Sequence, residues 1–247
     1  MGNQMRLDRF LADAGLGTRT EVKKYIRQGR IKIGEEIVNR PDLKTDGQDV
    51  FFDGNPVSAS PEHLYYLLNK PAGWVSATED TREKTVLDLL PPHPRRNLFP
   101  VGRLDKDTEG LLLITDDGAL AHALLAPGRH VDKVYEALVR GKLGEESVRA
   151  FENGMDIGDD KPTLPAKLEL IEDRIENGVP YVLVRITLHE GRYHQVKRMI
   201  KACGGEVVRL RRLSMGNLTL PDGLLPGQWL KMTADTLFFL ANSNKQG

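Results

Sequence analysis

Cysteine is almost missing from this chain of 247 residues, because Cys203 is its single example. One thiol excludes a disulfide within the chain and a zinc site built from cysteines, and it favours a reducing compartment. No stretch approaches the ~18 consecutive apolar residues of a membrane-spanning helix. The N-terminus also lacks the apolar core of a secretion signal. We therefore expect a cytoplasmic protein that makes no use of a membrane.

The chain also lacks a net charge, because 35 lysines and arginines balance 35 aspartates and glutamates. The charges are nevertheless segregated along the sequence. Residues 17–32 contain six basic side chains and one acidic one, residues 185–212 contain eight and two, and residues 143–176 contain four and ten. A neutral chain does not by itself predict a polyanionic partner, but two basic patches favour contacts with phosphates.

Three acidic side chains, those of Asp105, Asp107 and Glu109, precede the apolar run of residues 111–114. A short continuous run of this kind predicts a strand that is buried on both faces. The acids then lie on a loop held by a core strand, where chemistry is common. From the residues alone, two other interpretations stay open: solvated turn residues that bond their own backbone, and a Mg²⁺ site.

A second polar stretch, residues 190–199, reads Glu-Gly-Arg-Tyr-His-Gln-Val-Lys-Arg-Met. Val196, Met199 and Ile200 have helical spacing and make one apolar face, so Lys197 falls on another face. A helix that begins near His194 directs backbone N–H groups and basic side chains toward an anion. We predict no metal site in this chain, since the histidines of this stretch have no third ligand in sight.

The first 60 residues predict two short helices followed by short strands. Thr18 and Glu21 have the spacing of a capping box for the second helix, which exposes a row of bases. The small, polar residues 58–62 are the best linker candidate. We therefore expect two domains, at residues 1–60 and 61–247.

Several motifs together resemble those of one enzyme family. Gly-Arg-Leu-Asp at residues 102–105, with Asp-Thr and Gly-Leu directly after it, resembles the signature of pseudouridine synthases. Lys-Pro-Ala-Gly at 70–73, Lys-Val-Tyr at 133–135 and Gly-Arg-Tyr-His-Gln-Val-Lys at 191–197 resemble the other family motifs. Residues 5–57 resemble an S4 RNA-binding domain. The combination is typical of the RsuA type, which modifies ribosomal RNA.

The resemblance implies an α+β fold: an N-terminal S4 domain, followed by a catalytic domain built on a long mixed, mainly antiparallel sheet. It implies an isomerase that turns a uridine of ribosomal RNA into pseudouridine. The stretch before Lys197 looks closest to enzymes that act on 16S (small-subunit) rRNA. The alternatives are a 23S (large-subunit) target and a non-catalytic S4-type RNA-binding protein. An isomerisation needs no cofactor.

The resemblance also implies roles for individual residues. Asp105 corresponds to the nucleophile, Tyr135 to the residue that stacks on the target base, and Lys197 to the cation that pairs with the nucleophile. Arg198 is the alternative for that cation. Contacts with RNA are expected from Arg103, Leu210, Arg192, Arg198, Arg19, Lys23, Lys24 and Arg27. The expected partner is ribosomal RNA within an assembling particle, and the expected state is a monomer.

Overall fold

The computed structural model describes residues 4–57, 63–91, 97–126 and 131–234. Contacts between Cα atoms divide the chain into two compact units that separate between Glu62 and His63. The predicted linker at residues 58–62 lies outside the described residues, so the domain boundary near it stays a prediction. No helix in the described part of the chain has the length and apolar character to cross a membrane.

The N-terminal unit packs two helices, α1 (Leu7–Asp13) and α2 (Arg19–Arg27), on small sheets. The capping box forms as predicted: Thr18 Oγ1 accepts from the Glu21 amide at 3.2 Å, and the Glu21 carboxylate accepts from the Thr18 amide at 2.6 Å. The main sheet has the order β3-β2-β5-β6, and β1 pairs with β4. These strands are β1 (Met5–Arg6), β2 (Ile31–Ile33), β3 (Glu36–Ile37), β4 (Lys44–Thr45), β5 (Val50–Phe52) and β6 (Asn55–Pro56).

The C-terminal unit is built on a nine-stranded sheet with the order β11-β12-β10-β13-β9-β7-β15, in which β8 and β14 pair at the side with β9 and β13. Among the strands that the structure describes in this sheet, only the β13–β9 pair is parallel, so the sheet is mixed and mainly antiparallel, as predicted. The strands are β7 (Tyr65–Lys70), β8 (Phe99–Pro100), β9 (Glu109–Thr115), β10 (Lys133–Arg140), β11 (Lys167–Glu176), β12 (Val179–Leu188), β13 (Glu206–Met215), β14 (Leu218–Thr219) and β15 (Trp229–Met232). A short 3₁₀ helix, η1 (Val86–Leu89), precedes β8.

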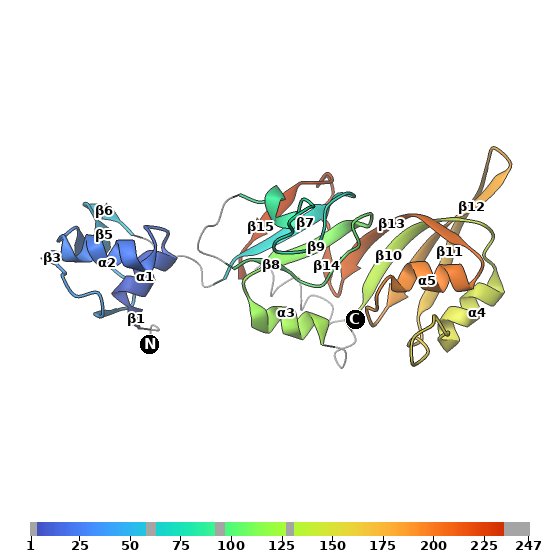
Figure 1. Cartoon of the computed structure of the whole chain (residues 1–247), viewed down its shortest axis with the longest axis horizontal. Coiled ribbons are helices and arrows are strands. Elements are labelled where there is room, and N and C mark those ends of the chain that lie inside the picture. Colours follow the sequence, from blue (N-terminus) through green and yellow to red (C-terminus); the bar gives the residue numbers. More distant parts are fainter. Residues whose placement is uncertain (1–3, 58–62, 92–96, 127–130, 235–247) are drawn as a thin grey trace. The chain divides into compact units, whose positions relative to one another are not determined.

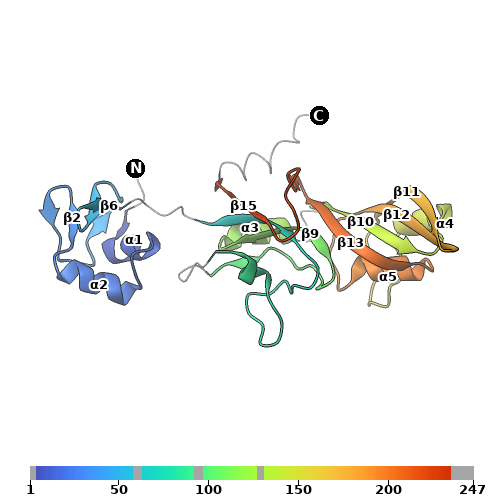
Figure 2. The same ribbon diagram turned by 90° about the horizontal axis from the view of Figure 1, so that it is seen from above.

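Helices cover both faces of this sheet, and β9 shows why. Leu112 and Ile114 belong to the apolar cluster that includes residues of α4 (Glu145–Asn153) and α5 (Gln195–Ala202). Leu111 and Leu113 point the other way, into a cluster with α3 (Gly118–Leu125). All four side chains are 0% exposed, which confirms the predicted strand buried on both faces. Figures 1 and 2 show α4 and α5 side by side against the strands β10 to β13.

The parallel pairing of β9 with β13 depends on one glycine. Gly110 has a φ of +104°, and a Cβ atom at this position would lie 2.2 Å from the backbone oxygen of Arg212. Because only glycine permits both this φ and this approach, residue 110 lets the two strands come together. The loop before β9, which carries Asp105, is thereby anchored beside β13.

The long strand β11 is absent from the elements that the sequence predicts. Its residues are mostly exposed and many are charged, so the alternation of apolar and polar residues that marks a half-buried strand is absent. The strand forms because its backbone pairs with β12 from Lys167↔Thr187 to Glu176↔Val179. Figure 1 shows this hairpin extending beyond the neighbouring strands.

Candidate active site

Asp105 lies on the loop between β8 and β9, and that loop is fastened on several sides. The amide of Val101 donates to the Leu113 carbonyl at 2.7 Å, and the amide of Thr108 donates to the Asp105 carbonyl at 3.0 Å. Buried Ser76 holds Leu104 through two bonds, since its Oγ accepts from the Leu104 amide at 3.1 Å and donates to the Leu104 carbonyl at 2.9 Å. The backbone on both sides of Asp105 is therefore fixed.

A buried lysine fixes the same loop from beneath. Lys70 is 0% exposed, and its ammonium donates to the carbonyls of Pro71 (3.1 Å), Asp105 (3.1 Å), Lys106 (3.2 Å) and Thr108 (2.7 Å). Burial lowers the pKa of Lys70 to about 8, while nearby carboxylates oppose the shift. The group is thus a cation at neutral pH, and its carbonyl partners replace the water that burial removed.

The helix α5 approaches the loop from the other side, and its first turn is unusual. His194 precedes the helix with a φ of +48°, in the left-handed region that few residues other than glycine adopt. The buried Gln195 locks this turn, because its side-chain oxygen accepts from the Arg192 amide at 2.9 Å and its nitrogen donates to Glu190 at 2.8 Å. The helix therefore begins at Gln195, directly after its N-cap residue His194, in agreement with the prediction of a start near His194.

The start of α5 brings two nitrogen-bearing side chains, those of Lys197 and His194, to Asp105. Lys197 Nζ lies 2.9 Å from Asp105 Oδ2 and 2.6 Å from Asp107 Oδ1, and His194 Nε2 lies 3.3 Å from Asp105 Oδ1. The Asp105 side chain is 27% exposed, whereas that of Asp107 is 72% exposed. Asp105 is therefore the more enclosed of the two acids, and it has an ionic or polar partner at each oxygen.

The charges around Lys197 favour its protonated form. Partial burial lowers the pKa of Lys197, but the bonds with Asp107 and Asp105 outweigh that effect and raise it above the ordinary lysine value. For Asp107, burial raises the pKa, and the bond and charge of Lys197 outweigh this and lower it. A lysine that stays charged favours the ionised form of a carboxylate in contact with it.

The two residues expected near the target base lie on neighbouring strands. Tyr135 on β10 is 9% exposed and Leu210 on β13 is 6% exposed. Both belong to one apolar cluster with Leu104, the residue directly before Asp105, and with Val196 of α5. The strands that carry Tyr135 and Leu210 thus share their core with both segments of the site.

Two family models match the chain. A model described as RNA pseudouridylate synthase matches residues 64–202, which include Asp105, Tyr135 and Lys197, and a model described as the S4 domain matches residues 5–51. The chain belongs to the RNA pseudouridylate synthase family. The S4 domain and the synthase domain follow each other as predicted.

Individual relatives agree over almost the whole length. The chain is 44% identical over 239 residues to an uncharacterized RNA pseudouridine synthase of Bacillus subtilis, covering 96% of this chain and 98% of the relative. It is 37% identical over 235 residues to ribosomal small subunit pseudouridine synthase A of Escherichia coli, covering 94% and 98%. A crystal structure of a pseudouridylate synthase matches with a TM-score of 0.65 and 36% identity, covering 96% and 99%.

In a pseudouridine synthase, the geometry at Asp105 suits nucleophilic catalysis. A carboxylate can act as a nucleophile, and one oxygen of Asp105 is paired with the Lys197 ammonium at 2.9 Å. The Mg²⁺ interpretation left open by the sequence gains no support, because the described residues hold no group of three or more histidines, cysteines or acids that could bind a metal ion.

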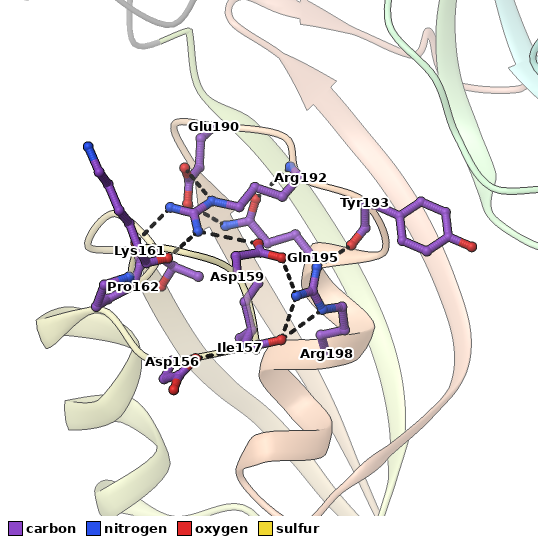
Figure 3. A network of polar contacts seen from close by, with 12 residues as sticks. Asp156, Ile157, Asp159, Lys161, Pro162, Glu190, Arg192, Tyr193, Gln195 and Arg198 are labelled. Carbon is purple, nitrogen blue, oxygen red and sulfur yellow. Dashed lines mark hydrogen bonds and ion pairs between the residues drawn. The ribbon is translucent and has the colours of Figure 1, made fainter.

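Arg192 and Arg198, two predicted RNA contacts, lie in a different network, drawn in Figure 3. Arg192 donates to the carbonyls of Lys161 and Pro162, each at 2.6 Å, and pairs with Glu190 at 3.0 Å. Arg198 binds the carbonyl of Ile157 at 3.0 Å and pairs with Asp159 at 2.5 Å. These arginines bind the segment after α4 to the start of α5, and Arg198, the alternative partner of Asp105, is instead committed to this segment.

The remaining predicted RNA contacts lie on the surface. Arg103 is exposed two residues before Asp105. In the N-terminal unit, Arg19, Lys24 and Arg27 are exposed on α2, whereas Lys23 is half-buried and lies 3.7 Å from the buried Asp8. These placements leave each role as a prediction.

The sequence does not reveal that three residues, Lys70, Ser76 and His194, support Asp105. The Lys-Pro-Ala-Gly string indicated a family motif at Lys70, but it carried no sign that the ammonium holds the Asp105 loop. The sequence indicates His194 as the start of a helix, as part of a family motif and as a metal ligand without partners, but not as a partner of Asp105; Ser76 carries no signal. Each of the three contacts a segment that is distant in sequence, so a local sequence pattern cannot predict its contact. The one signal in the sequence is the spacing of His194 and Lys197 at the start of α5.

Proposed function

We propose that this protein converts a specific uridine of small-subunit (16S) ribosomal RNA into pseudouridine, with Asp105 as the nucleophile. The observation that carries the proposal is the enclosed Asp105 carboxylate, held between Lys197 at 2.9 Å and His194 at 3.3 Å. The RNA target is supported by relatives named for the small ribosomal subunit, such as the Yersinia pestis enzyme at 39% identity over 235 residues.

The proposed reaction balances without a cofactor. The bond from ribose C1′ to N1 of uracil breaks, the base turns, and a bond from C1′ to C5 forms. The C5 proton leaves and N1 gains a proton, so substrate and product are isomers. A carboxylate nucleophile divides this exchange into easier steps.

The other predicted residues have matching tasks. The target base must leave its stack, which costs a few kcal/mol. We infer that Tyr135 stacks on the extruded base, and that Leu210 packs beside it. Lys197 pairs with the Asp105 carboxylate and holds it in position before attack. We assign the exposed bases Arg19, Lys24 and Arg27 to phosphates of the RNA. Such contacts position the protein on the RNA but do not distinguish one base sequence from another.

We also propose the setting in which the enzyme acts. It modifies ribosomal RNA within an assembling particle, in the cytoplasm, and it acts as a monomer. The single cysteine is consistent with a reducing compartment. Sedimentation of the protein alone and with particles from growing cells tests both the monomer and the particle.

The decisive experiment maps pseudouridine in the ribosomal RNA of a strain that lacks this gene. We expect one site in small-subunit rRNA to lose its modification. Restoring the wild-type gene should restore the site, and restoring the Asp105→Asn gene should not. A site lost from large-subunit rRNA instead would establish the alternative target. An unchanged map would favour a non-catalytic RNA-binding protein.

A further inference from the structure

An exposed aromatic ring stands beside the proposed nucleophile and has no assigned task. Tyr193 is 75% exposed, on the turn between β12 and α5. Single exposed apolar side chains are common on protein surfaces, so exposure alone means little. The surroundings of this ring carry more information.

The turn that holds Tyr193 is rigid. The guanidinium of Arg198 donates to the Tyr193 carbonyl at 3.1 Å, while the same arginine is tied to Ile157 and Asp159. Gln195 closes the turn through the Arg192 amide. Figure 3 shows the Tyr193 ring pointing away from this network, which binds its backbone but leaves its side chain outside. The backbone that carries the ring is thus fixed, while the outer surface of the ring stays open.

One face of the ring is already stacked. The Tyr193 and His194 rings lie 3.8 Å apart between centroids, with an interplanar angle of 21°. His194 in turn lies 3.3 Å from Asp105 through Nε2. A flat, preformed platform therefore stands one ring away from the nucleophile, and its remaining face is large and accessible.

We propose that the open face of Tyr193 stacks on the base of a nucleotide next to the target uridine. This inference rests on the proposed function. When a base is extruded, its neighbour in the strand loses a stacking partner, and an aromatic side chain replaces it without regard to base identity. Tyr193 would then fix the flanking nucleotide, while the buried Tyr135 receives the extruded base.

The test compares Tyr193→Ala, Tyr193→Leu and Tyr193→Phe with the parent on unmodified small-subunit rRNA transcribed in vitro. Equilibrium binding and single-turnover formation of pseudouridine are measured on the same RNA. Since stacking of one base is worth ~1–3 kcal/mol, we expect the Ala and Leu variants to need about 5- to 150-fold more enzyme for half-saturation. The Phe variant keeps the ring and should match the parent, and all variants should approach the parental rate at saturation.

A matched control is Ile175→Ala, which removes a similarly exposed apolar side chain (79%) from the β11–β12 hairpin; its affinity should equal that of the parent. Equal affinity of the parent and Tyr193→Ala would overturn the inference. So would full affinity of Tyr193→Leu, since that points to a general apolar contact, as with a protein partner. A loss confined to the saturated rate would also overturn it, because Tyr193 would then act through His194.

The two proposals fail in different ways. If the parent forms pseudouridine and Tyr193→Ala binds equally well, the stacking inference fails and the enzymatic function stands. If the parent forms none on either ribosomal RNA while affinity still depends on the ring at residue 193, the proposed function fails, and what remains is an RNA contact of Tyr193 with no target uridine beside it. Once the site is mapped, a short RNA with 2-aminopurine beside the target gives a direct signal: the Asp105→Asn variant should quench its fluorescence, and the added Tyr193→Leu change should remove that quenching.

Discussion

At the scale of single residues, the site separates two acids that composition cannot distinguish. Asp105 is enclosed between His194 and Lys197, while Asp107 is 72% exposed and touches Lys197 from outside. An amide has the shape of a carboxylate without its charge. The two Asp→Asn variants therefore test which of the two carboxylates is the nucleophile.

We predict that Asp105→Asn abolishes turnover but keeps the fold and RNA binding. Affinity should rise, if it changes, because one negative charge leaves a phosphate-rich interface. Asp107→Asn should keep most activity, since an exposed ion pair is worth at most ~1 kcal/mol. Single-turnover formation of pseudouridine measures both, with circular dichroism as the folding control. An active Asp105 variant beside an inactive Asp107 variant would reverse the assignment.

After Asp105, Lys197 is the residue whose replacement should lower the rate of the reaction most. We predict that Lys197→Met lowers the single-turnover rate by about 10²-fold, the usual cost of removing one preorganised charge. Lys197 is only partly buried, unlike neighbouring Val196 and Met199, so α5 should stay folded. Thermal unfolding should therefore show little change.

Arg198→Met is the matched control on the same helix. Its guanidinium holds Ile157 and Asp159, so we expect a lower melting temperature and a smaller effect on the saturated rate. If Arg198→Met lost the chemistry and Lys197→Met kept it, the alternative partner of Asp105 would be the right one.

At the scale of elements, the end of β7 and the loop before β9 act as one unit through Lys70. The ammonium binds three carbonyls of residues 105–108. Burial lowers the pKa of Lys70 to about 8, so its charge disappears as the pH rises through that value. We predict that the saturated rate falls above pH 8, because a neutral amine holds the loop less firmly.

The stability of the fold should change in the opposite direction to the rate as the pH rises. Lys70 releases its proton at a lower pH in the folded state than in the unfolded state, so this group stabilises the fold increasingly between about pH 8 and 10.5. The rate should therefore fall between pH 7 and 9 without unfolding. Lys70→Met should be slow already at pH 7, with no step near 8. Lys106→Met, on the exposed side of the same loop, should keep the parental profile; an unchanged profile for Lys70→Met would show that another group titrates.

Elements were predictable where their signal is local. The capping box of α2 and the buried run of β9 are complete within a few residues, so the sequence was sufficient. By contrast, β11 is held by its partner strand rather than by its own pattern. The contact of His194 with Asp105 joins segments 89 positions apart by their residue numbers, so the site could be placed by family motifs but its support could not.

At the scale of the whole molecule, the chain has no net charge and yet is assigned a polyanionic substrate. The uneven distribution of the charges over the molecule explains how a chain without net charge can bind RNA. Exposed bases lie on α2 of the N-terminal unit, whereas acids outnumber bases by ten to four in residues 143–176 of the C-terminal unit. We infer that the S4 domain supplies affinity and the synthase domain supplies chemistry. The two contributions should then be separable by charge.

We predict that the triple variant Arg19→Gln, Lys24→Gln and Arg27→Gln binds ribosomal RNA more weakly and with a flatter salt dependence. Each phosphate contact on a single strand adds about 0.7 to the slope of log affinity against log salt, so losing three lowers the slope by about 2. The saturated rate should not change, since Asp105 and its partners are untouched. Affinity measured across a salt series provides both the intercept and the slope.

The matched control removes three exposed bases from the acidic stretch, residues 143–176, instead: Arg149→Gln, Lys167→Gln and Arg174→Gln. Both triple variants change the net charge by the same amount, so a difference between them comes from position alone. The control should keep the parental slope, because Lys167 and Arg174 are already paired with Glu169 and Glu172. Equal slopes for the two triple variants would mean that α2 touches no phosphate. The affinity would then have to come from the synthase domain, whose bases lie around α5 and β13.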